Sequence, residues 1–321
     1  MIARLKAALE GAQSVALVCH LSPDMDTLGS AVALRYILEA QGKRAVVYDQ
    51  DEVPERYLFL EGLDAVRRPD DEVYDLALAV DVSDEARMGE AARVFAAARS
   101  RAMIDHHRTT APFAPVYVLR PEAAATAQIV AELCAYFGWE IPQPAAMCLC
   151  AGMSTDTGNF SFDSVTGDTF RAAGACVDRG ARVSAITERL YRTSTLGHVR
   201  MMGRVLNGLE MRCGGKIALL CARQSDFAEL NATREDAEGI VNLGLEIEGV
   251  QAAALLTERE GLIKCSLRAK EPLDVSTVAA RFGGGGHKGA AGCSFPGITM
   301  EKAAAQMTAA CEDYLRELNL L

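Results

Sequence analysis

The 321-residue sequence contains no apolar run approaching the roughly 20 residues that a membrane-spanning helix needs. Its first ten residues carry Glu10 and lack the apolar stretch and cleavage site of a signal peptide, so they predict a short amphipathic helix. None of the ten cysteines forms a CxxC pair, which argues against a structural zinc site. We therefore expect a cytoplasmic protein whose thiols are reduced and mostly buried.

An excess of positive charge is also absent. The chain has 33 Lys and Arg against 43 Asp and Glu, a formal net charge of −10. Long duplex nucleic acid needs a basic face, so this class of partner is not expected. A small phosphorylated substrate is still allowed, because metal ions and a few local basic side chains can supply the positive charge.

The first part of the chain alternates strand-length apolar runs with helical patterns, and its length allows two domains. Continuous apolar strands between helices predict an α/β domain with a parallel sheet and helices on both faces. The expected strands cover 14–19, 44–48, 76–80, 102–104 and 116–119. Helical patterns occupy 85–100 and 124–137, and Pro142 and Pro144 begin a helix that runs into 151–160.

The pattern changes after residue 214, where strands become consecutive and predict a smaller α+β domain. Expected strands are 216–222, 250–257 and 262–269, followed by helices at 275–282 and 300–318 on either side of a glycine run. We predict a catalytic domain over 1–190, a helical connection over 191–208 and a second domain over 209–321, with a cleft between the domains.

The sequence Asp105-His106-His107 follows an apolar strand directly, and strand exits of parallel sheets are where α/β proteins place their chemistry. Two other exits carry related residues, namely His20-x-x-x-Asp24-x-Asp26 and Asp81. Capping of the next helix explains one of Asp24 and Asp26, but not both together with His20.

Asp156 lies in Ser154-Thr155-Asp156-Thr157-Gly158, where a cap or turn residue is the alternative interpretation. Together with the strand exits it completes a set of carboxylates and imidazoles without thiolates. Such a set suits Mn²⁺ or Mg²⁺, with Co²⁺ or Zn²⁺ as substitutes. The carboxylates suffice to bridge two ions, and two ions about 3.5–4 Å apart are a common device for displacement at phosphorus.

The glycine run at 283–286 continues into His287 and Lys288. Glycines let backbone N–H groups approach an anion closely, and the two basic side chains add donors. A flexible linker has a similar composition, but ordered patterns flank this run on both sides. Arg268, at the end of an expected strand, is a further candidate for binding phosphate.

These motifs resemble those of DHH-family phosphoesterases with a DHH-associated C-terminal domain, and within that family the nanoRNase and pAp phosphatase group. They occur in the family's order from about residue 15 to residue 293, at 20–30, 81–89, 105–107, 152–158 and 283–292. One departure is Met25, where the family often has a small residue; a larger side chain here is expected to narrow the metal pocket without removing a ligand.

The resemblance implies two divalent ions, Mn²⁺ first and Mg²⁺ or Co²⁺ as alternatives. It assigns His20, Asp24, Asp26 and Asp81 to one ion, and Asp26, Asp81, His106 and Asp156 to the other. Asp105 would orient His106, and His107 would contact the scissile phosphate. The other end of the substrate would be bound by Arg268, Gly285, Gly286, His287 and Lys288. For Arg87 and Arg192 an ordinary salt bridge is an equally good interpretation.

The implied activity is hydrolysis of very short single-stranded RNA to 5′-mononucleotides and of 3′-phosphoadenosine 5′-phosphate to AMP, by a metal-activated water. Hydrolysis of cyclic or linear di-adenylate is the nearest alternative, because it would use the same metal centre. A pyrophosphatase fits less well with the glycine run, and a non-catalytic nucleotide sensor fits less well with six candidate ligands. Membrane association is not expected, and a homodimer is left open.

Overall fold

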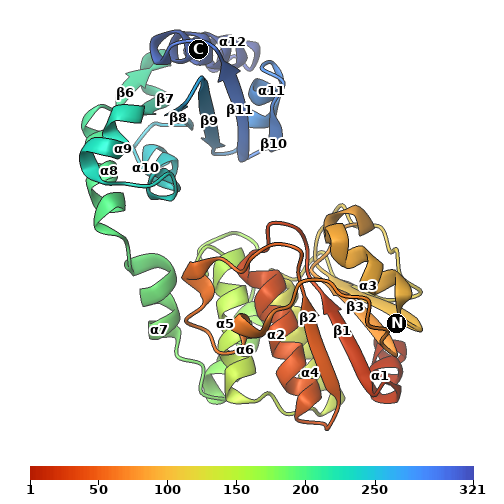
Figure 1. The fold of residues 1–321 in the computed structure, drawn as a ribbon. Helices are drawn as coiled ribbons and strands as arrows, with labels where there is room; N and C mark the ends of the chain where they lie inside the picture. The colour runs from red at the N-terminus through yellow and green to blue at the C-terminus, as the bar shows by residue number, and fades with distance from the viewer. The chain divides into compact units, whose positions relative to one another are not determined.

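The computed structural model describes residues 1–321 and divides the chain into two compact units, Met1–Thr193 and Ser194–Leu321 (Figure 1). No helix combines the length and apolar character needed to cross a bilayer. The segment 191–208, predicted as a helical connection, contains the helix α8 (Leu196–Asn207), and α8 packs on strand β7 (Ile217–Ala222) inside the second unit.

The first unit is built on a five-stranded sheet in which every strand pair is parallel, in the order β2-β1-β3-β4-β5. This arrangement confirms the predicted α/β fold class. The strands are β1 (Ser14–Val18), β2 (Arg44–Tyr48), β3 (Leu76–Val80), β4 (Ser100–Asp105) and β5 (Val116–Leu119). The strand order reverses between β1 and β3, and ligands of open α/β sheets bind at the carboxyl ends of the strands beside such a point.

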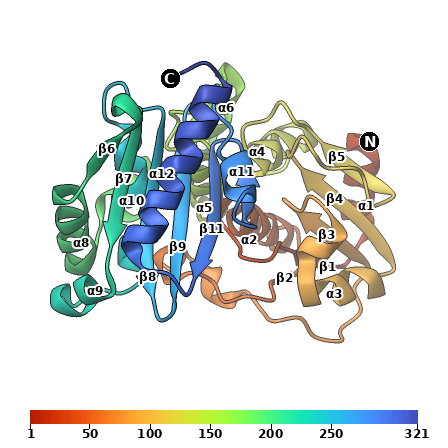
Figure 2. The ribbon, with the colours of Figure 1, turned by 90° about the horizontal axis from the view of Figure 1, so that it is seen from above.

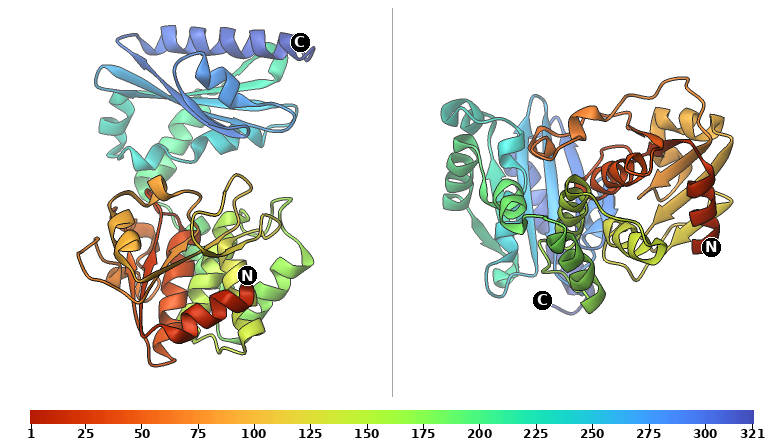
Figure 3. Two further views of the ribbon diagram at one scale, coloured as in Figure 1. Left: turned by 90° about the vertical axis from the view of Figure 1, so that its right-hand side faces the viewer. Right: turned by 90° about the horizontal axis from the view of Figure 1, so that it is seen from below.

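Alternate residues of the strands enter two different cores. Val15 and Leu17 of β1 join the larger core with α1 (Ile2–Gly11), α2 (Met25–Glu39), α4 (Thr126–Phe137) and α5 (Gln143–Asp156). Ala16 and Val18 face the smaller core under α3 (Ala92–Ala97). The two-residue period of a strand therefore explains why these runs are apolar throughout. Figure 3 gives two further views of the helices that pack around this sheet.

Further helical segments complete the first unit. They are η1 (Glu55–Tyr57), η2 (Leu63–Ala65), η3 (Glu85–Ala91), α6 (Gly167–Asp178), α7 (Val183–Thr187) and η4 (Glu188–Arg192). The single helix predicted over 85–100 is wrong. Gly89 has φ +52° and ψ −132°, which interrupts the helical geometry within η3, α3 ends at Ala97, and β4 already begins at Ser100. The Gly89 backbone can adopt this conformation because glycine has no Cβ.

The second unit has a six-stranded mixed sheet in the order β10-β11-β9-β8-β7-β6, in which only β7 and β8 pair in parallel. The remaining strands are β6 (Glu210–Arg212), β8 (Ala252–Arg259), β9 (Leu262–Ala269), β10 (Gly285–His287) and β11 (Ala290–Pro296). This is the predicted α+β domain, although β6 was not predicted because a three-residue strand has too few residues to show alternation.

Helices cover both faces of part of this sheet. Figure 2 shows α12 (Met300–Glu317) lying across β7 and β8, and with α11 (Val275–Ala280) it closes one core. On the opposite face, α8, α9 (Gln224–Leu230) and α10 (Ile240–Leu245) pack on β7 and β8. Two short turns are η5 (Cys213–Gly215) and η6 (Glu235–Ala237). The opposite face of β9, β11 and β10 contributes no residue to that second core.

Candidate metal centre

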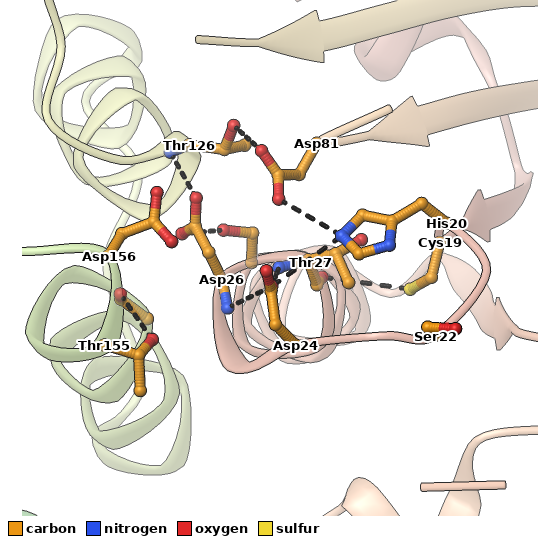
Figure 4. Close-up of polar contacts among 12 residues, drawn as sticks. Cys19, His20, Ser22, Asp24, Asp26, Thr27, Asp81, Thr126, Thr155 and Asp156 are labelled. Atoms are coloured by element: carbon orange, nitrogen blue, oxygen red, sulfur yellow. Dashed lines mark hydrogen bonds and ion pairs between the residues drawn. The ribbon is translucent and has the colours of Figure 1, made fainter. Parts of the chain in front are cut away.

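Three neighbouring strands of the first sheet deliver acidic and imidazole side chains to one place. Figure 4 shows two of these side chains, His20 and Asp81, beside Asp24, Asp26 and Asp156. His20 follows β1, Asp81 follows β3 directly, and Asp105 and His106 lie at the end of β4. Because these strands are parallel and adjacent, their carboxyl ends meet at the reversal of strand order between β1 and β3. The predicted clustering of strand-exit residues is thus found in the structure.

Two helices supply the rest of the cluster. Asp24 is the N-cap of α2, where its Oδ1 accepts hydrogen bonds from the backbone N–H groups of Asp26 (3.0 Å) and Thr27 (3.2 Å). The capping interpretation therefore holds for Asp24. Asp26, the second residue of the helix, is fully buried and accepts hydrogen bonds from the N–H groups of Thr126 (2.7 Å) and Ala127 (2.9 Å). The first turn of α4 thereby orients the Asp26 carboxylate.

The donor atoms form three overlapping groups, and within each group all atoms lie within 4.8 Å of one another. The groups are His20 with Asp24 and Asp81, Asp81 with His106 and His107, and Asp26 with His106 and Asp156. Asp81 and His106 are each shared by two groups. The closest imidazole–carboxylate pair in these groups is His106 Nε2 and Asp156 Oδ2 at 3.0 Å, while Asp81 Oδ1 lies 3.6 Å from His106 Nε2 and its Oδ2 lies 3.7 Å from His20 Nε2.

The rings of His20 and His106 are held in the orientation that suits a metal ligand. The Nδ1 of His20 donates to the carbonyl of Leu21 at 2.9 Å, and the Nδ1 of His106 donates to the carbonyl of Ala123 at 3.2 Å. With Nδ1 engaged, the Nε2 of each ring faces the carboxylates. A hydrogen bond from the second ring nitrogen is the usual way in which proteins orient metal-binding histidines.

The charges of this cluster are unbalanced without a cation. Burial alone would lower the pKa of His20, but hydrogen bonds with Asp24 and Asp81 raise it to about 10. Burial likewise opposes the shift at His106, where the hydrogen bond with Asp156 and the charge of Asp26 raise the pKa to about 10. Burial and the charge of Asp81 raise the pKa of Asp26 well above its usual value. Divalent cations would relieve this repulsion, so the donor set fits a metal centre.

Asp81 itself occupies a special backbone position. Its φ is +62°, in the left-handed region that Asp and Asn enter more readily than other side chains. The side chain is 2% exposed, and its Oδ1 accepts a hydrogen bond from Thr126 Oγ1 at 2.8 Å. This geometry directs the carboxylate toward both histidines, which is why Asp81 takes part in two of the donor groups.

Asp105 contacts a different histidine from the one predicted. Its Oδ1 accepts from His107 Nδ1 at 2.7 Å, and its Oδ2 accepts from Thr110 Oγ1, whereas His106 is oriented by the Ala123 carbonyl. Consecutive residues at a strand exit point in different directions, so Asp105 and His107 share a side while His106 does not. The hydrogen bond with Asp105 raises the pKa of His107.

Met25 does not narrow the cluster as expected. It is fully buried among the apolar side chains of the larger core, and its Cε lies beneath Gly29 of α2. The first helical residue of α2 thus points inward to the core, and the second, Asp26, points to the donor groups. A larger side chain at position 25 is a packing feature of the helix, not of the site.

The glycine run forms an edge strand of the second sheet, not an open loop. Within it, β10 pairs with β11, so His287 lies opposite Ala290, and Ala290 in turn lies opposite Arg268 of β9. Residues paired across strands project from the same face, which places His287 and Arg268 in one row about two strand spacings apart. Gly285, Gly286, His287 and Lys288 are exposed, as an anion-binding role requires.

The two remaining candidates, Arg87 and Arg192, do not belong to the row of His287 and Arg268. Arg87 is exposed in η3, and its Nη2 lies 3.4 Å from His20 Nδ1, so it stands beside the cluster of the first unit. Arg192 is exposed at the end of η4 and forms no ion pair; it lines a shallow cavity with residues of α7. Neither side chain forms the structural salt bridge that was the predicted alternative.

Two hydrogen-bond donors of the cluster and one buried carboxylate at a neighbouring strand exit were missed in the sequence. Thr126 binds both Asp81 and Asp26, and Thr110 binds Asp105. Asp49 follows β2 and is 1% exposed, and burial raises its pKa to about 6. Asp49 could have been found by the same rule as Asp81, since it directly follows an apolar strand of a parallel sheet. The two threonines carry no comparable signal, because threonine is common at helix starts and in loops.

Comparison with known proteins agrees with this architecture. The model of the DHH family N-terminal domain matches residues 14–153, and that of the DHHA1 domain matches residues 199–317. The chain is 30% identical over its whole length to the bifunctional oligoribonuclease and PAP phosphatase NrnA of Thermus thermophilus, covering 95% of that protein. It is 25% identical to the cyclic-di-AMP phosphodiesterase PdeA of Listeria monocytogenes over 97% of this chain but 49% of the relative.

A solved structure shares the whole fold. An exopolyphosphatase-related protein from Bacteroides fragilis superposes with a TM-score of 0.91 and 28% identity, covering 99% of this chain and 97% of the other. A parallel-sheet domain with acidic and imidazole side chains at its strand exits, followed by a mixed-sheet domain, defines a metal-dependent phosphoric ester hydrolase. The chain belongs to the DHH family of phosphoesterases, with a DHHA1 domain as its second unit.

Proposed function

We propose that this protein hydrolyses very short RNA oligonucleotides to 5′-mononucleotides and 3′-phosphoadenosine 5′-phosphate to AMP. The observation that supports this most directly is the set of three overlapping donor groups at the strand exits of the first unit. Such a centre serves phosphate-ester hydrolysis in general. The similarity over the full chain to a relative named as an oligoribonuclease and PAP phosphatase narrows the substrate class.

The metal ligands we propose are His20, Asp24, Asp26, Asp81, His106 and Asp156, holding two divalent ions. Mn²⁺ is the first choice and Mg²⁺ or Co²⁺ the alternatives, because the donors are carboxylates and imidazoles. When bound, such ions neutralise charge on phosphate oxygens and lower the pKa of a coordinated water. Asp81 and Asp26 are the proposed bridging carboxylates.

His107 is the proposed contact to the scissile phosphate. Asp105 engages its Nδ1, which leaves the Nε2 edge of a side chain that is 44% exposed available to a phosphate oxygen. The hydrogen bond with Asp105 also raises the pKa of His107, which favours the protonated ring that an anionic ester would bind. Asp105 therefore acts through His107 as a positioning residue.

We assign the binding of the rest of the substrate to the second unit. Arg268 and His287 lie in one row of its sheet, and Gly285, Gly286 and Lys288 are exposed at the adjoining edge. An edge strand offers backbone N–H groups that are not engaged within the sheet, and glycine allows a phosphate to approach them. Ten free cysteines support a reducing compartment, so we place the enzyme in the cytoplasm.

A second candidate function is hydrolysis of cyclic or linear di-adenylate. The similarity to a relative named as a cyclic-di-AMP phosphodiesterase favours it, although the chain spans about half of that relative. The metal centre would be the same in both cases. The difference would lie in how the second nucleotide is bound.

One experiment tests the proposal and ranks the alternatives. Initial rates are measured with Mn²⁺ on a trinucleotide, 3′-phosphoadenosine 5′-phosphate, cyclic and linear di-adenylate, and pyrophosphate. We expect the first two to be hydrolysed fastest, and EDTA to abolish their turnover. Faster hydrolysis of cyclic di-adenylate would favour the second candidate, and turnover of pyrophosphate alone would refute the proposal.

A further inference from the structure

The loop that follows Asp156 has an unusual backbone. Gly158, Asn159 and Phe160 have φ values of +55°, +58° and +61°, so three consecutive residues occupy the left-handed region. This region is costly for a bulky side chain such as Phe. Strained positions of this kind persist when the surrounding structure holds them, and they cluster at functional sites.

Hydrogen bonds fold this loop back onto the end of α5. The Asn159 N–H donates to the carbonyl of Ser154 at 2.7 Å, and the Phe160 N–H donates to Thr157 Oγ1 at 2.9 Å. The Phe162 N–H donates to the carbonyl of Thr157 at 3.0 Å. These partners flank Asp156 in the chain, so the loop is fixed next to one of the proposed metal ligands.

The loop and the helix after it present aromatic rings to solvent. Phe162 is 59% exposed and Phe170, in α6, is 58% exposed. The Phe160 ring stacks on Phe170 with centroids 5.7 Å apart and an interplanar angle of 23°. The Phe162 ring lies directly over Gly158, where a Cβ would collide with it. An aromatic ring that packs against the protein on one face and is exposed to solvent on the other is suited to stacking with a flat ligand.

The charges around these rings indicate what kind of group can bind. Asp163 and Asp168 are exposed nearby in the sequence, and Arg171 is paired with Asp168 at 2.5 Å. No unpaired basic side chain accompanies the rings between residues 157 and 171. A phosphate would be repelled here, whereas a neutral aromatic ring would not.

We infer that Phe162 and Phe170 form a stacking platform for a nucleobase of the substrate whose phosphate binds at the metal centre. This inference rests on the proposed function, and it adds a base-binding subsite in the first unit to the phosphate contacts assigned to the second. Stacking on aromatic side chains tolerates every base, so the platform favours nucleotides over inorganic phosphates without selecting a base sequence.

The test compares Phe162→Leu and Phe170→Leu with the aromatic variant Phe162→Tyr. Tyr136→Leu is the matched control, because Tyr136 is a 69% exposed aromatic residue of the same unit. It lies ten residues along α4 from Thr126, about 15 Å from the donor groups. Substrates are an RNA dinucleotide and two analogues, each lacking one of its bases. Melting temperatures confirm that each variant is folded.

For the intact dinucleotide, we expect each leucine variant to raise KM about 5- to 100-fold with kcat within about twofold, since base stacking contributes at this level. Phe162→Tyr and Tyr136→Leu should behave as the wild type. On the analogue lacking the stacked base, wild type and leucine variants should have the same KM.

Three outcomes would overturn the inference. In the first, KM is unchanged in both leucine variants although the wild type cleaves the dinucleotide; the proposed function then stands. In the second, KM rises equally on all three substrates. In the third, the variants alter only the oligomeric state in sedimentation, which would identify the rings as a contact between copies of the chain. A wild type that cleaves no dinucleotide would overturn the proposed function as well.

Discussion

Replacing Asp81 by Asn is the most informative perturbation of the proposed centre. Asn has the same shape, tolerates the left-handed φ of +62°, and can still accept the hydrogen bond from Thr126 Oγ1. Alanine would leave that buried hydroxyl without its partner, at a cost of about 1–3 kcal/mol. The asparagine variant therefore removes one negative charge from between His20 and His106 and changes little else.

Two effects of opposite sign are expected. Asp81 contributes, after burial, to the raised pKa of Asp26, so removing its charge relieves repulsion in the metal-free protein. Removing this charge also removes the attraction of Asp81 to the protonated rings of His20 and His106, so the stability of the metal-free variant should lie close to that of the metal-free wild type. Turnover should fall about 100-fold or more, because the shared carboxylate that holds the cations is lost.

The stabilisation of the folded protein by bound metal can be calculated, because an ion that binds only the folded state shifts the unfolding equilibrium. At a Mn²⁺ concentration 100 times the dissociation constant, the wild type gains about 2.7 kcal/mol. For a unit of this size, Met1–Thr193, that gain corresponds to a rise in melting temperature of about 5–10 °C. The variant should show a much smaller rise at the same Mn²⁺ concentration.

The assay is differential scanning calorimetry with and without Mn²⁺, together with initial rates. Asp64→Asn, which removes an exposed carboxylate of the same unit, is the matched control and should respond as the wild type does. If Asp81→Asn retained both the Mn²⁺-dependent rise and full turnover, Asp81 would not be a metal ligand. A wild type that no divalent ion stabilises would refute the metal centre itself.

Three further predictions concern the remaining parts of the molecule. A bound Mn²⁺ ion must displace protons from His20 and His106, because their pKa values are about 10. The affinity for Mn²⁺, measured by titration calorimetry between pH 8 and pH 6, should therefore fall about tenfold per displaced proton for each pH unit. An affinity that does not change with pH would contradict this prediction. Asp105→Asn should lower kcat about 10- to 100-fold and leave Mn²⁺ binding unchanged. Because Asp105 raises the pKa of His107, the variant should also lose activity at a lower alkaline pH than the wild type. Gly284→Ala should destabilise the second unit by about 1–3 kcal/mol in denaturant unfolding, because its Cβ would collide with the backbone of β11; an unaltered midpoint would show that the edge strand can shift.

The sequence by itself determined the sheet and the position of the site. Runs such as Leu76–Val80 are apolar at every residue because both faces of a parallel strand are buried, and each run ends where a polar residue follows. Adjacent parallel strands bring those ends together, so His20, Asp81 and His106 were predictable as neighbours before any coordinates. Asp156 and the glycine run were located by their motifs.

Only the tertiary structure decided which partners these side chains take. Asp105 binds His107, and Thr126 links Asp81 to the start of α4, although 45 residues separate the two in the chain. The edge pairing of β10 places His287 in a row with Arg268, and the stacking of Phe160 on Phe170 depends on a left-handed turn. Periodicity reports the face on which a residue lies, whereas contacts across such distances depend on the register of strands and the packing of helices, which no local pattern encodes.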